Sequence, residues 1–286
     1  MLEFDFLVIG GGASGMTAAA AAAENGKYSV LLLESRGYLG GILPQCIHEG
    51  FGTGQTGPEY EKKIERRFLS SGAEYMLEST VMRIDDDSTA LFSCRSGIFK
   101  VRYKYLLMAT GCTEIPFGAL GIAGTRPEGI YGAGQVQELI NIRHKDLGDN
   151  FVILGCGDLG MVMTGQLASQ GKNVAAVVER ESSFTGTRRN YRKYIENNRI
   201  PVLFDSTIAR VEGTGRIDAV VLDDGRTIKC DTLLIAAGLR CDTVLTDKLD
   251  DRKNIFFCGN CERVHDMVES AIIQSETTVN TILEAL

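Results

Sequence analysis

Residues 6–15 read FLVIGGGASG, and this stretch decides the fold. Its first four residues form a short apolar run, which predicts a buried β-strand. An Ala-rich stretch at 16–25 predicts a helix that Gly26 ends, and residues 29–33 predict a second strand that closes on Glu34. The order strand, glycine-rich turn, helix, strand and acid predicts a βαβ unit of a parallel sheet.

The glycines of this turn have separate physical roles. Gly10 permits the tight turn, Gly12 lets a pyrophosphate approach the backbone, and Gly15 lets the helix pack closely on the strand. The start of the helix offers free N–H groups and a partial positive charge to the phosphates. Glu34 follows Gly15 by 19 residues, where a carboxylate can accept hydrogen bonds from a ribose diol. We therefore predict a dinucleotide-binding site.

The same pattern occurs a second time. Residues 151–154 (FVIL) predict a strand, residues 155–160 (GCGDLG) repeat the glycine turn, residues 161–170 predict a helix, and residues 174–178 predict a strand leading to Glu179. The three glycines and the acid each lie 145 residues after their counterparts in the first copy. One such turn is weak evidence, but two copies at one constant offset are strong evidence for two nucleotide-binding units.

A third correspondence predicts how the two units are connected. Residues 105–111 (YLLMATG) resemble residues 233–238 (LLIAAG), because each is an apolar strand that ends in small residues and glycine. A last strand and turn at 255–260 and a helix at 267–284 have no counterpart in the second copy. The sequence therefore predicts an α/β protein with two Rossmann-like dinucleotide-binding domains, the second inserted into the first. The predicted domains are residues 1–114 with 243–286, and residues 115–242.

The composition narrows the classes of function. The 286 residues carry a net charge of −7, which disfavours nucleic acid or an anionic membrane as partner, since both need a basic surface. No apolar run reaches the roughly 18 residues of a membrane span. The first basic residue is Lys27, whereas a signal peptide begins with basic residues, and the eight cysteines are scattered. We expect a cytoplasmic protein with reduced thiols.

Together these motifs resemble the pyridine nucleotide–disulfide oxidoreductase superfamily, in the size class of the thioredoxin reductases. The resemblance covers nearly the whole chain and implies that the first copy holds FAD and the inserted copy holds NAD(P)H. It implies FAD contacts from a first set of residues: Gly10, Gly12, Ala13, Ser14, Gly15, Glu34, Ser35, Gly40, Gly41, Val81, Ala109, Thr110, Gly111, Gly259 and Asn260. It implies nicotinamide-dinucleotide contacts from a second set: Gly155, Gly157, Asp158, Leu159, Gly160, Glu179, Arg180 and Gly238.

The chain departs from the superfamily at its redox motifs. Residues 129–135 (GIYGAGQ) stand where thioredoxin reductases carry a Cys-x-x-Cys. The cysteine pair that follows the double glycine in the glutathione-reductase branch is reduced to Cys46 alone. Asn260 stands where the family usually has Asp, which changes the expected flavin contact by removing a charge. Ordinary thioredoxin reductase activity is therefore not expected.

Three segments, residues 40–52, 124–127 and 265–266, resemble one branch more closely. Its members are NAD(FAD)-dependent dehydrogenases that accompany anaerobic glycerol-3-phosphate dehydrogenase-type flavoproteins. The resemblance implies a subunit that reacts with the nicotinamide and has a partner flavoprotein dehydrogenase subunit. The chain lacks a segment that this branch commonly carries between Leu245 and Asn254.

Two groups of residues are candidates for catalytic chemistry. Cys46 with His48 is the most reactive-looking pair, because a thiolate beside a histidine can act as a nucleophile or redox group. The plainer explanation is that Cys46 is a small residue beneath the flavin and that His48 makes local hydrogen bonds. Cys258 and Cys261 can form a redox pair, bind a metal ion with His265, or form an inert turn. The turn explanation is favoured because the flavin motif already accounts for this position, and no metal is predicted.

The second acid predicts the choice of nicotinamide cofactor. Glu179 favours NADH, because a carboxylate bonds a free ribose diol and repels the 2′-phosphate of NADPH. A basic cluster follows this acid and favours NADPH instead, because such a cluster can bind the 2′-phosphate; it comprises Arg180, Arg188 and Arg189. The alternative is that these three side chains are exposed to solvent and bind no cofactor. We predict an FAD-dependent NAD(P)H oxidoreductase with a preference for NADH.

Two other functions remain open. One is a self-sufficient NAD(P)H oxidase, or a quinone or disulfide reductase that uses Cys46 or the pair Cys258 and Cys261. The other is a flavin-binding scaffold without catalytic activity. A homodimer is compatible with each of these functions.

Overall fold

The computed structural model of the chain describes residues 1–245 and 253–286. The segment that we expected to be missing between Leu245 and Asn254 therefore falls largely on positions outside the described residues. No helix in the described ranges has both the length and the apolar character needed to cross a bilayer.

The chain forms two compact units, which we call unit 1 and unit 2. Unit 1 comprises Met1–Thr113 and Arg240–Leu286, and unit 2 comprises Glu114–Leu239. Two short strands, β9 (Cys112–Glu114) and β19 (Leu239–Cys241), include these division points and pair with each other. The sequence placed the divisions at 114/115 and 242/243.

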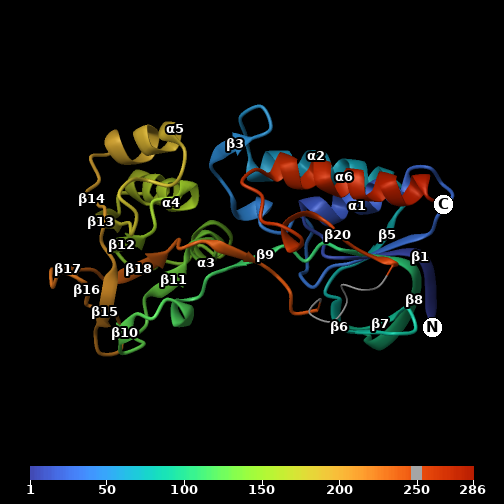
Figure 1. The fold of residues 1–286 in the computed structure, drawn as a ribbon, viewed down its shortest axis with the longest axis horizontal. Helices are drawn as coiled ribbons and strands as arrows, with labels where there is room; N and C mark the ends of the chain where they lie inside the picture. Colours follow the sequence, from blue (N-terminus) through green and yellow to red (C-terminus); the bar gives the residue numbers. More distant parts are fainter. Residues whose placement is uncertain (246–252) are drawn as a thin grey trace. The chain divides into compact units, whose positions relative to one another are not determined.

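Unit 1 is built on a seven-stranded sheet (Figure 1). Its central strand β1 pairs in parallel with β2 on one side and with β8 on the other, and β8 pairs in parallel with β20 and antiparallel with β7. The strands of the sheet are β5 (Glu74–Met76), β2 (Val30–Leu33), β1 (Leu2–Ile9), β8 (Gly97–Met108), β7 (Thr89–Cys94), β6 (Thr80–Asp85) and β20 (Ile255–Phe257).

Three helices lie together along one face of this sheet, as Figure 1 shows: α1 (Ala13–Ala23), α2 (Gly57–Ser70) and α6 (Val268–Glu284). The alternation of β1 sends Phe6 and Val8 into the core beneath these helices, and Leu7 and Ile9 into the core on the opposite face. Short elements complete the unit: η1 (Leu43–Gln45), the hairpin β3 (Glu49–Phe51) and β4 (Gln55–Thr56), and η5 (Gly259–Cys261).

Unit 2 has a five-stranded parallel sheet and a separate four-stranded sheet. The first contains, in order, β11 (Ile130–Gly132), β18 (Thr232–Ile235), β12 (Asn150–Leu154), β13 (Asn173–Val178) and β14 (Val202–Leu203). The second contains β10 (Ala123–Gly124), β15 (Ile208–Glu212), β16 (Ala219–Leu222) and β17 (Thr227–Lys229). Val152 packs with Val211 and Val220 of the second sheet, whereas its neighbours Phe151 and Ile153 pack in the core that contains helical residues.

Unit 2 has one α-helix of more than two turns, α4 (Asp158–Ser169), and several shorter helical segments. The shorter segments are η2 (Phe117–Ala119), α3 (Ala133–Gln137) continued by the π-helical η3 (Glu138–Ile142), and α5 (Arg188–Asn190) continued by the π-helical η4 (Tyr191–Glu196). The predicted α/β fold with two Rossmann-type units is therefore present.

Several predicted element boundaries were wrong by a few residues. Helices α1 and α4 begin at Ala13 and Asp158, three residues before the predicted starts, because Gly12 and Gly157 are the N-cap residues and the last glycine of each turn is already helical. Strand β1 begins at Leu2 rather than at residue 6, because its pairing with β8 extends along the whole strand. A regular β-ladder satisfies the backbone there whatever the side-chain pattern.

Candidate functional site

The glycine turn of unit 1 has the backbone conformation that its sequence predicts. Gly10 adopts a φ of +107°, and a Cβ there would collide with the carbonyl oxygen of Ala109. A Cβ on Gly15 would collide with the carbonyl oxygen of Gly10. By contrast, a Cβ on Gly12 would have no atom nearer than 3.9 Å, and Gly12 begins α1 without a side-chain cap. The turn therefore leaves open backbone at the start of a helix, where phosphate groups bind.

Glu34 is buried at the end of β2 and is fixed by backbone N–H groups. Its carboxylate accepts hydrogen bonds from the amides of Gly11 at 2.6 Å and Arg36 at 2.7 Å, and from the hydroxyl of Ser35 at 3.2 Å. A carboxylate has about four acceptor positions, so a ribose diol can still be accommodated. The carboxylate is thus held beside the glycine turn, where the nucleotide ribose would lie.

Unit 2 repeats the backbone contacts of this arrangement. Gly155 adopts a φ of +109°, and Gly157 begins α4 without a side-chain cap. The buried Glu179 carboxylate accepts the amides of Cys156 at 2.7 Å and Glu181 at 3.0 Å. These donors lie 145 residues after Gly11 and Arg36, so both copies place their acid by the same two contacts.

The residues around the second acid differ from those around the first. Arg180 forms an ion pair with Glu181, with Nη2 to Oε1 at 3.1 Å. The Arg188 guanidinium lies 5.9 Å from the centre of the Phe184 ring. Asp158 turns its carboxylate toward the segment after Phe184, where it accepts hydrogen bonds from both the amide and the hydroxyl of Thr187.

The remaining predicted residues of unit 1 gather near the carboxyl ends of β1, β8 and β20. The Gly40 amide donates to the Gly11 carbonyl at 2.8 Å, and a Cβ on Gly41 would lie 3.0 Å from Gly12. The Ala109 amide donates to the Ile9 carbonyl, and a Cβ on Gly259 would collide with Ser14. The set brought together comprises Gly10, Gly12, Ala13, Ser14, Gly15, Gly40, Gly41, Ala109, Thr110, Gly111, Gly259 and Asn260. Val81 lies in β6 with its side chain buried, two residues after Ser79, whose amide donates to the Glu34 carbonyl at 2.8 Å; its predicted contact with the nucleotide through the backbone stays a prediction.

In unit 2 the corresponding set surrounds the start of α4. The Ala236 amide donates to the Leu154 carbonyl, so the end of β18 lies against the second glycine turn. A Cβ on Gly155 would collide with the Ala236 carbonyl, and one on Gly160 with the Gly155 carbonyl. Leu159 packs in the core beneath the turn. Gly238, two residues after Ala236, has a φ of +118°.

The predicted reactive cysteines lie in environments that favour the neutral thiol. Burial raises the pKa of Cys46 to about 12, and its Sγ donates to the Ile42 carbonyl at 3.3 Å. Burial also raises the pKa of Cys258 and of Cys261, and Cys261 Sγ donates to the Met108 carbonyl at 2.9 Å. Within the described residues no three His, Cys, Asp or Glu side chains are arranged to hold a metal ion, so nothing there supports the metal explanation. His48 stacks on Phe51 with ring centres 5.1 Å apart.

A half-buried acid that the sequence did not single out lies in unit 2. Glu114 accepts the amide of Gly134 at 2.7 Å, at the start of α3. Burial raises its pKa, more than the backbone N–H groups at residues 133–135 lower it. The one feature of the sequence that could have drawn attention to Glu114 is its charge, which lies between Thr113 and the apolar Ile115.

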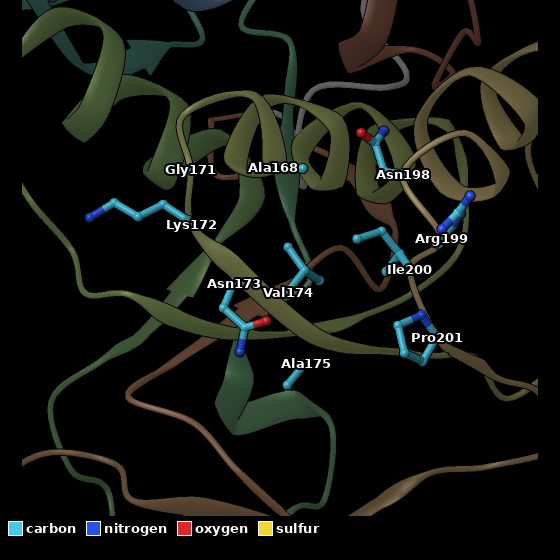
Figure 2. Close-up of a pocket in the computed structure, with 10 residues that line it drawn as sticks. All are labelled: Ala168, Gly171, Lys172, Asn173, Val174, Ala175, Asn198, Arg199, Ile200 and Pro201. Atoms are coloured by element: carbon cyan, nitrogen blue, oxygen red, sulfur yellow. The ribbon is translucent and has the colours of Figure 1, made fainter.

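A surface hollow in unit 2 lies at the opposite end of β13 from Glu179. Figure 2 shows residues that line it, among them Val174, Ala175 and Ile200, and the Lys172 side chain, which extends to the left of the view. The Lys172 ammonium is bound to the carboxylates of Asp146 at 2.9 Å and Asp149 at 2.8 Å. This hollow is therefore remote from the residues predicted to bind a nucleotide.

The room for a side chain at each glycine shows whether the two turns fit a dinucleotide. The positions that would bear phosphates, Gly12 and Gly157, are those at which a side chain would fill open space rather than strike the backbone. The flanking glycines, by contrast, are needed for close packing. This difference is the one expected of a cradle for a pyrophosphate, so the residues present in each unit fit a dinucleotide.

Comparison with curated proteins gives relatives of moderate similarity. The hydrogen cyanide synthase subunit HcnB of Pseudomonas aeruginosa is 27% identical over 276 residues, covering 85% of this chain and 58% of that protein. The NAD(P)H coenzyme A polysulfide/persulfide reductase of Pyrococcus horikoshii is 26% identical over 262 residues, covering 86% of this chain and 56% of that protein. The chain thus spans less than three fifths of the length of these two relatives.

Solved structures share the fold over the full length. The thioredoxin reductase of T. acidophilum aligns with a TM-score of 0.81 and 18% identity, covering 100% of this chain and 99% of that one. At this identity the likeness shows the fold alone. The family model described as pyridine nucleotide-disulphide oxidoreductase matches residues 4–269. The chain therefore belongs to the pyridine nucleotide-disulphide oxidoreductase family, whose members are oxidoreductases that bind FAD and NAD(P)H.

Proposed function

We propose that the chain is an FAD-dependent NAD(P)H oxidoreductase, with FAD bound by unit 1 and the nicotinamide dinucleotide by unit 2. The observation that carries this proposal is the repeated clamp on the acid. Glu34 and Glu179 are both buried, and each accepts two backbone amides at equivalent positions beside an open glycine turn. Two such sites in one chain suit a protein that transfers electrons between two dinucleotides.

The roles of the residues follow from their positions. The amides at the start of α1 and α4 hold the pyrophosphates, and Glu34 and Glu179 accept hydrogen bonds from the adenosine riboses. FAD supplies the two-electron chemistry when it is bound, whereas the protein fixes the position and polarity of the nucleotides. Hydride transfer needs no protein acid or base, which agrees with the neutral, buried thiols of Cys46, Cys258 and Cys261.

We further propose that NADH is favoured over NADPH. A 2′-phosphate would lie near the Glu179 carboxylate, and like charges repel. Arg180, which follows Glu179 in the sequence, could offset this repulsion, but its guanidinium is paired with Glu181. Arg188 is likewise engaged, since it lies over Phe184 and its Nη2 is 3.8 Å from the Glu196 carboxylate.

We propose that the chain works as the NADH-reacting subunit of a larger flavoprotein dehydrogenase assembly in the cytoplasm. The resemblance of residues 40–52, 124–127 and 265–266 supports this role, and one relative is itself named as a subunit of a synthase. The scattered cysteines favour a reducing compartment. A self-sufficient reductase is the second candidate, because the Pyrococcus horikoshii relative is named as a polysulfide/persulfide reductase.

Anaerobic titration of the purified chain tests the first part of the proposal. The protein is expected to carry a flavin whose visible absorbance is bleached by NADH, with NADPH less effective at equal concentration. A chain that cannot be reconstituted with FAD contradicts the proposal. If bound FAD resists both nicotinamides, the chain is instead a flavin-binding scaffold.

Copurification from the native source distinguishes a subunit from a self-sufficient enzyme. Activity on the physiological substrate is expected to need a second flavoprotein and to disappear when the two are separated. Full turnover by the isolated chain would reject the subunit role. Gel filtration of the isolated chain reports whether it is also a homodimer.

A further inference from the structure

Two cysteines lie opposite each other on the paired strands β9 and β19. The Asp242 amide donates to the Gly111 carbonyl at 3.0 Å, and the Ile115 amide donates to the Gly238 carbonyl at 3.0 Å. These two bonds fix an antiparallel register in which Cys112 faces Cys241.

The same bonds show which kind of pair this is. Residues 111 and 242 form a hydrogen-bonded pair, as do residues 115 and 238. Hydrogen-bonded and non-hydrogen-bonded pairs alternate along an antiparallel ladder, so Cys112 and Cys241 form a non-hydrogen-bonded pair. In the next pair along the ladder, Arg240 Nε lies 3.4 Å from Thr113 Oγ1, which supports this register.

A non-hydrogen-bonded pair has the dimensions that a disulfide needs. Its Cα atoms lie about 4.5 Å apart, and its side chains are on the same face and closer than in the alternating pairs. A disulfide spans Cα atoms about 4.4–6.8 Å apart, so a pair in this register falls within the range that a disulfide bridges. Both residues are thiols in the structure.

The environment of this pair differs from that of the other cysteines considered above. Cys112 and Cys241 are half-buried, whereas Cys46, Cys258 and Cys261 are buried. The Asn260 side-chain amide donates to Cys112 Sγ at 3.5 Å. An N–H donor at the sulfur favours the thiolate, which is the reactive form.

We propose that Cys112 and Cys241 form a redox-active dithiol that exchanges with small disulfides. The thiolate of one cysteine attacks a sulfur of the disulfide RSSR, its S–S bond breaks, and the first RS⁻ leaves and takes a proton from solvent. The second cysteine loses its proton and attacks the mixed disulfide, which releases the second RS⁻ to be protonated in turn. Two cysteine thiols are thereby oxidised to one disulfide, and RSSR is reduced to two RSH molecules.

This reaction has a structural consequence. Residues 113–240 lie between the two cysteines and contain all of unit 2. The oxidised form therefore closes unit 2 into a covalent loop at the two strands through which the chain enters and leaves it. Closing so long a loop restricts the unfolded chain, so oxidation is expected to raise the urea concentration needed for unfolding.

Treatment of the full chain with oxidised glutathione tests the proposal. The chain has eight cysteines, and the expected product keeps six thiols when counted after denaturation. A non-reducing peptide map should join the peptide of Cys112 to that of Cys241. A wild-type protein that keeps eight thiols, or that holds glutathione on Cys112 without forming the internal disulfide, overturns the proposal.

Three single substitutions locate the reaction. Cys112→Ser and Cys241→Ser should each abolish the internal disulfide. Cys94→Ser is the matched control, because Cys94 is also half-buried but lies at the end of β7; this variant should still lose two thiols. A control that loses none would overturn the assignment. The wild-type peptide map decides the question even if a variant fails to fold.

The rate of disulfide formation tests whether the Asn260 side chain activates Cys112. Asn260→Asp replaces the N–H donor with a negative charge beside the sulfur, so the internal disulfide should form several-fold more slowly. An unchanged rate would overturn the role of Asn260. Neither nucleotide takes part in these reactions, so their failure would leave the proposed oxidoreductase function intact.

Discussion

Unit 1 and unit 2 share one hydrogen-bonded framework and differ in the segments attached to it. The Gly10 amide donates to the Leu33 carbonyl, and the Gly155 amide donates to the Val178 carbonyl. In each unit the first glycine of the turn is thus bound to the last residue of the strand that precedes the acid. The Glu34 carbonyl accepts the Ser79 amide, as the Glu179 carbonyl accepts that of Ser206. A framework of this kind is the conserved geometry for holding a dinucleotide, and it depends on few side chains.

The difference lies in one stretch of each unit. The offset between equivalent residues is 145 up to Gly40 and Thr185, but 127 from Ser79 and Ser206 onward. Unit 1 uses the 18 additional residues for η1, for the hairpin β3 and β4, and for a longer helix, α2. The segment that holds Cys46 and His48 is therefore an addition to the shared framework. The comparison teaches that the nucleotide sites were duplicated, whereas the candidates for distinctive chemistry occur once.

The largest expected effect is on the packing that both units share. Gly15→Val should destabilise unit 1 by about 3 kcal/mol, because its side chain would collide with the Gly10 carbonyl and force the helix from the strand. Urea unfolding measures the change. Gly37→Ala is the control, since the nearest atom to its new Cβ would be 3.8 Å away. Equal stability of the two variants would show that the close packing is unnecessary.

The next effect separates binding from stability. Gly12 and Gly157 have φ values of −75° and −80°, which alanine adopts freely. Gly12→Ala should keep the unfolding midpoint but weaken FAD binding about tenfold or more, or about 1.4 kcal/mol, by filling the pyrophosphate cradle. Gly157→Ala should do the same to NADH binding alone. Titration of each ligand checks this, and a variant that weakens both ligands equally would contradict the assignment of one nucleotide to each unit.

An effect of similar size concerns the two acids. Glu179→Ala should reduce the preference for NADH over NADPH by about 1–3 kcal/mol, or roughly tenfold to a hundredfold. Glu181→Gln should reduce it only a few-fold, because an exposed ion pair that restrains Arg180 contributes about 0.2–1 kcal/mol. The ratio of the dissociation constants of NADH and NADPH, measured with the protein in its reduced and oxidised states, gives this preference. Glu34→Ala is the control from unit 1 and should leave the ratio unchanged.

The smallest effect is a pH dependence in unit 2. The pKa of Glu114 is raised by burial, so the folded protein binds a proton more tightly than the unfolded chain does. Stability from this group is therefore present at acidic pH and is lost as pH rises from the ordinary glutamate pKa through the raised one. Glu114→Gln should flatten that part of the profile of urea midpoint against pH. Parallel profiles for the variant and the wild type would show that Glu114 does not titrate in this range.

Much of the architecture could be predicted from short segments. The apolar runs, the glycine turns and the acids after them lie within some thirty residues of one another, so each βαβ unit is specified locally. The family and the α/β fold predicted from them are confirmed. The nucleotide contacts of individual residues stay predictions, although the open space at Gly12 and Gly157 agrees with them. The starts of α1, α4 and β1 were misjudged, because N-caps and strand pairing extend beyond the apolar pattern.

The sequence by itself determined the repeated framework, because turns, helix starts and strand patterns depend on neighbouring residues. Tertiary structure alone decided which distant residues meet. Glu114 reaches Gly134 through the fold, and burial sets the state of its carboxyl group and of the Cys46 thiol. Cys112 and Cys241 were two scattered cysteines in the sequence. The antiparallel register of β9 and β19 places them face to face, because a ladder brings together residues that no local pattern relates.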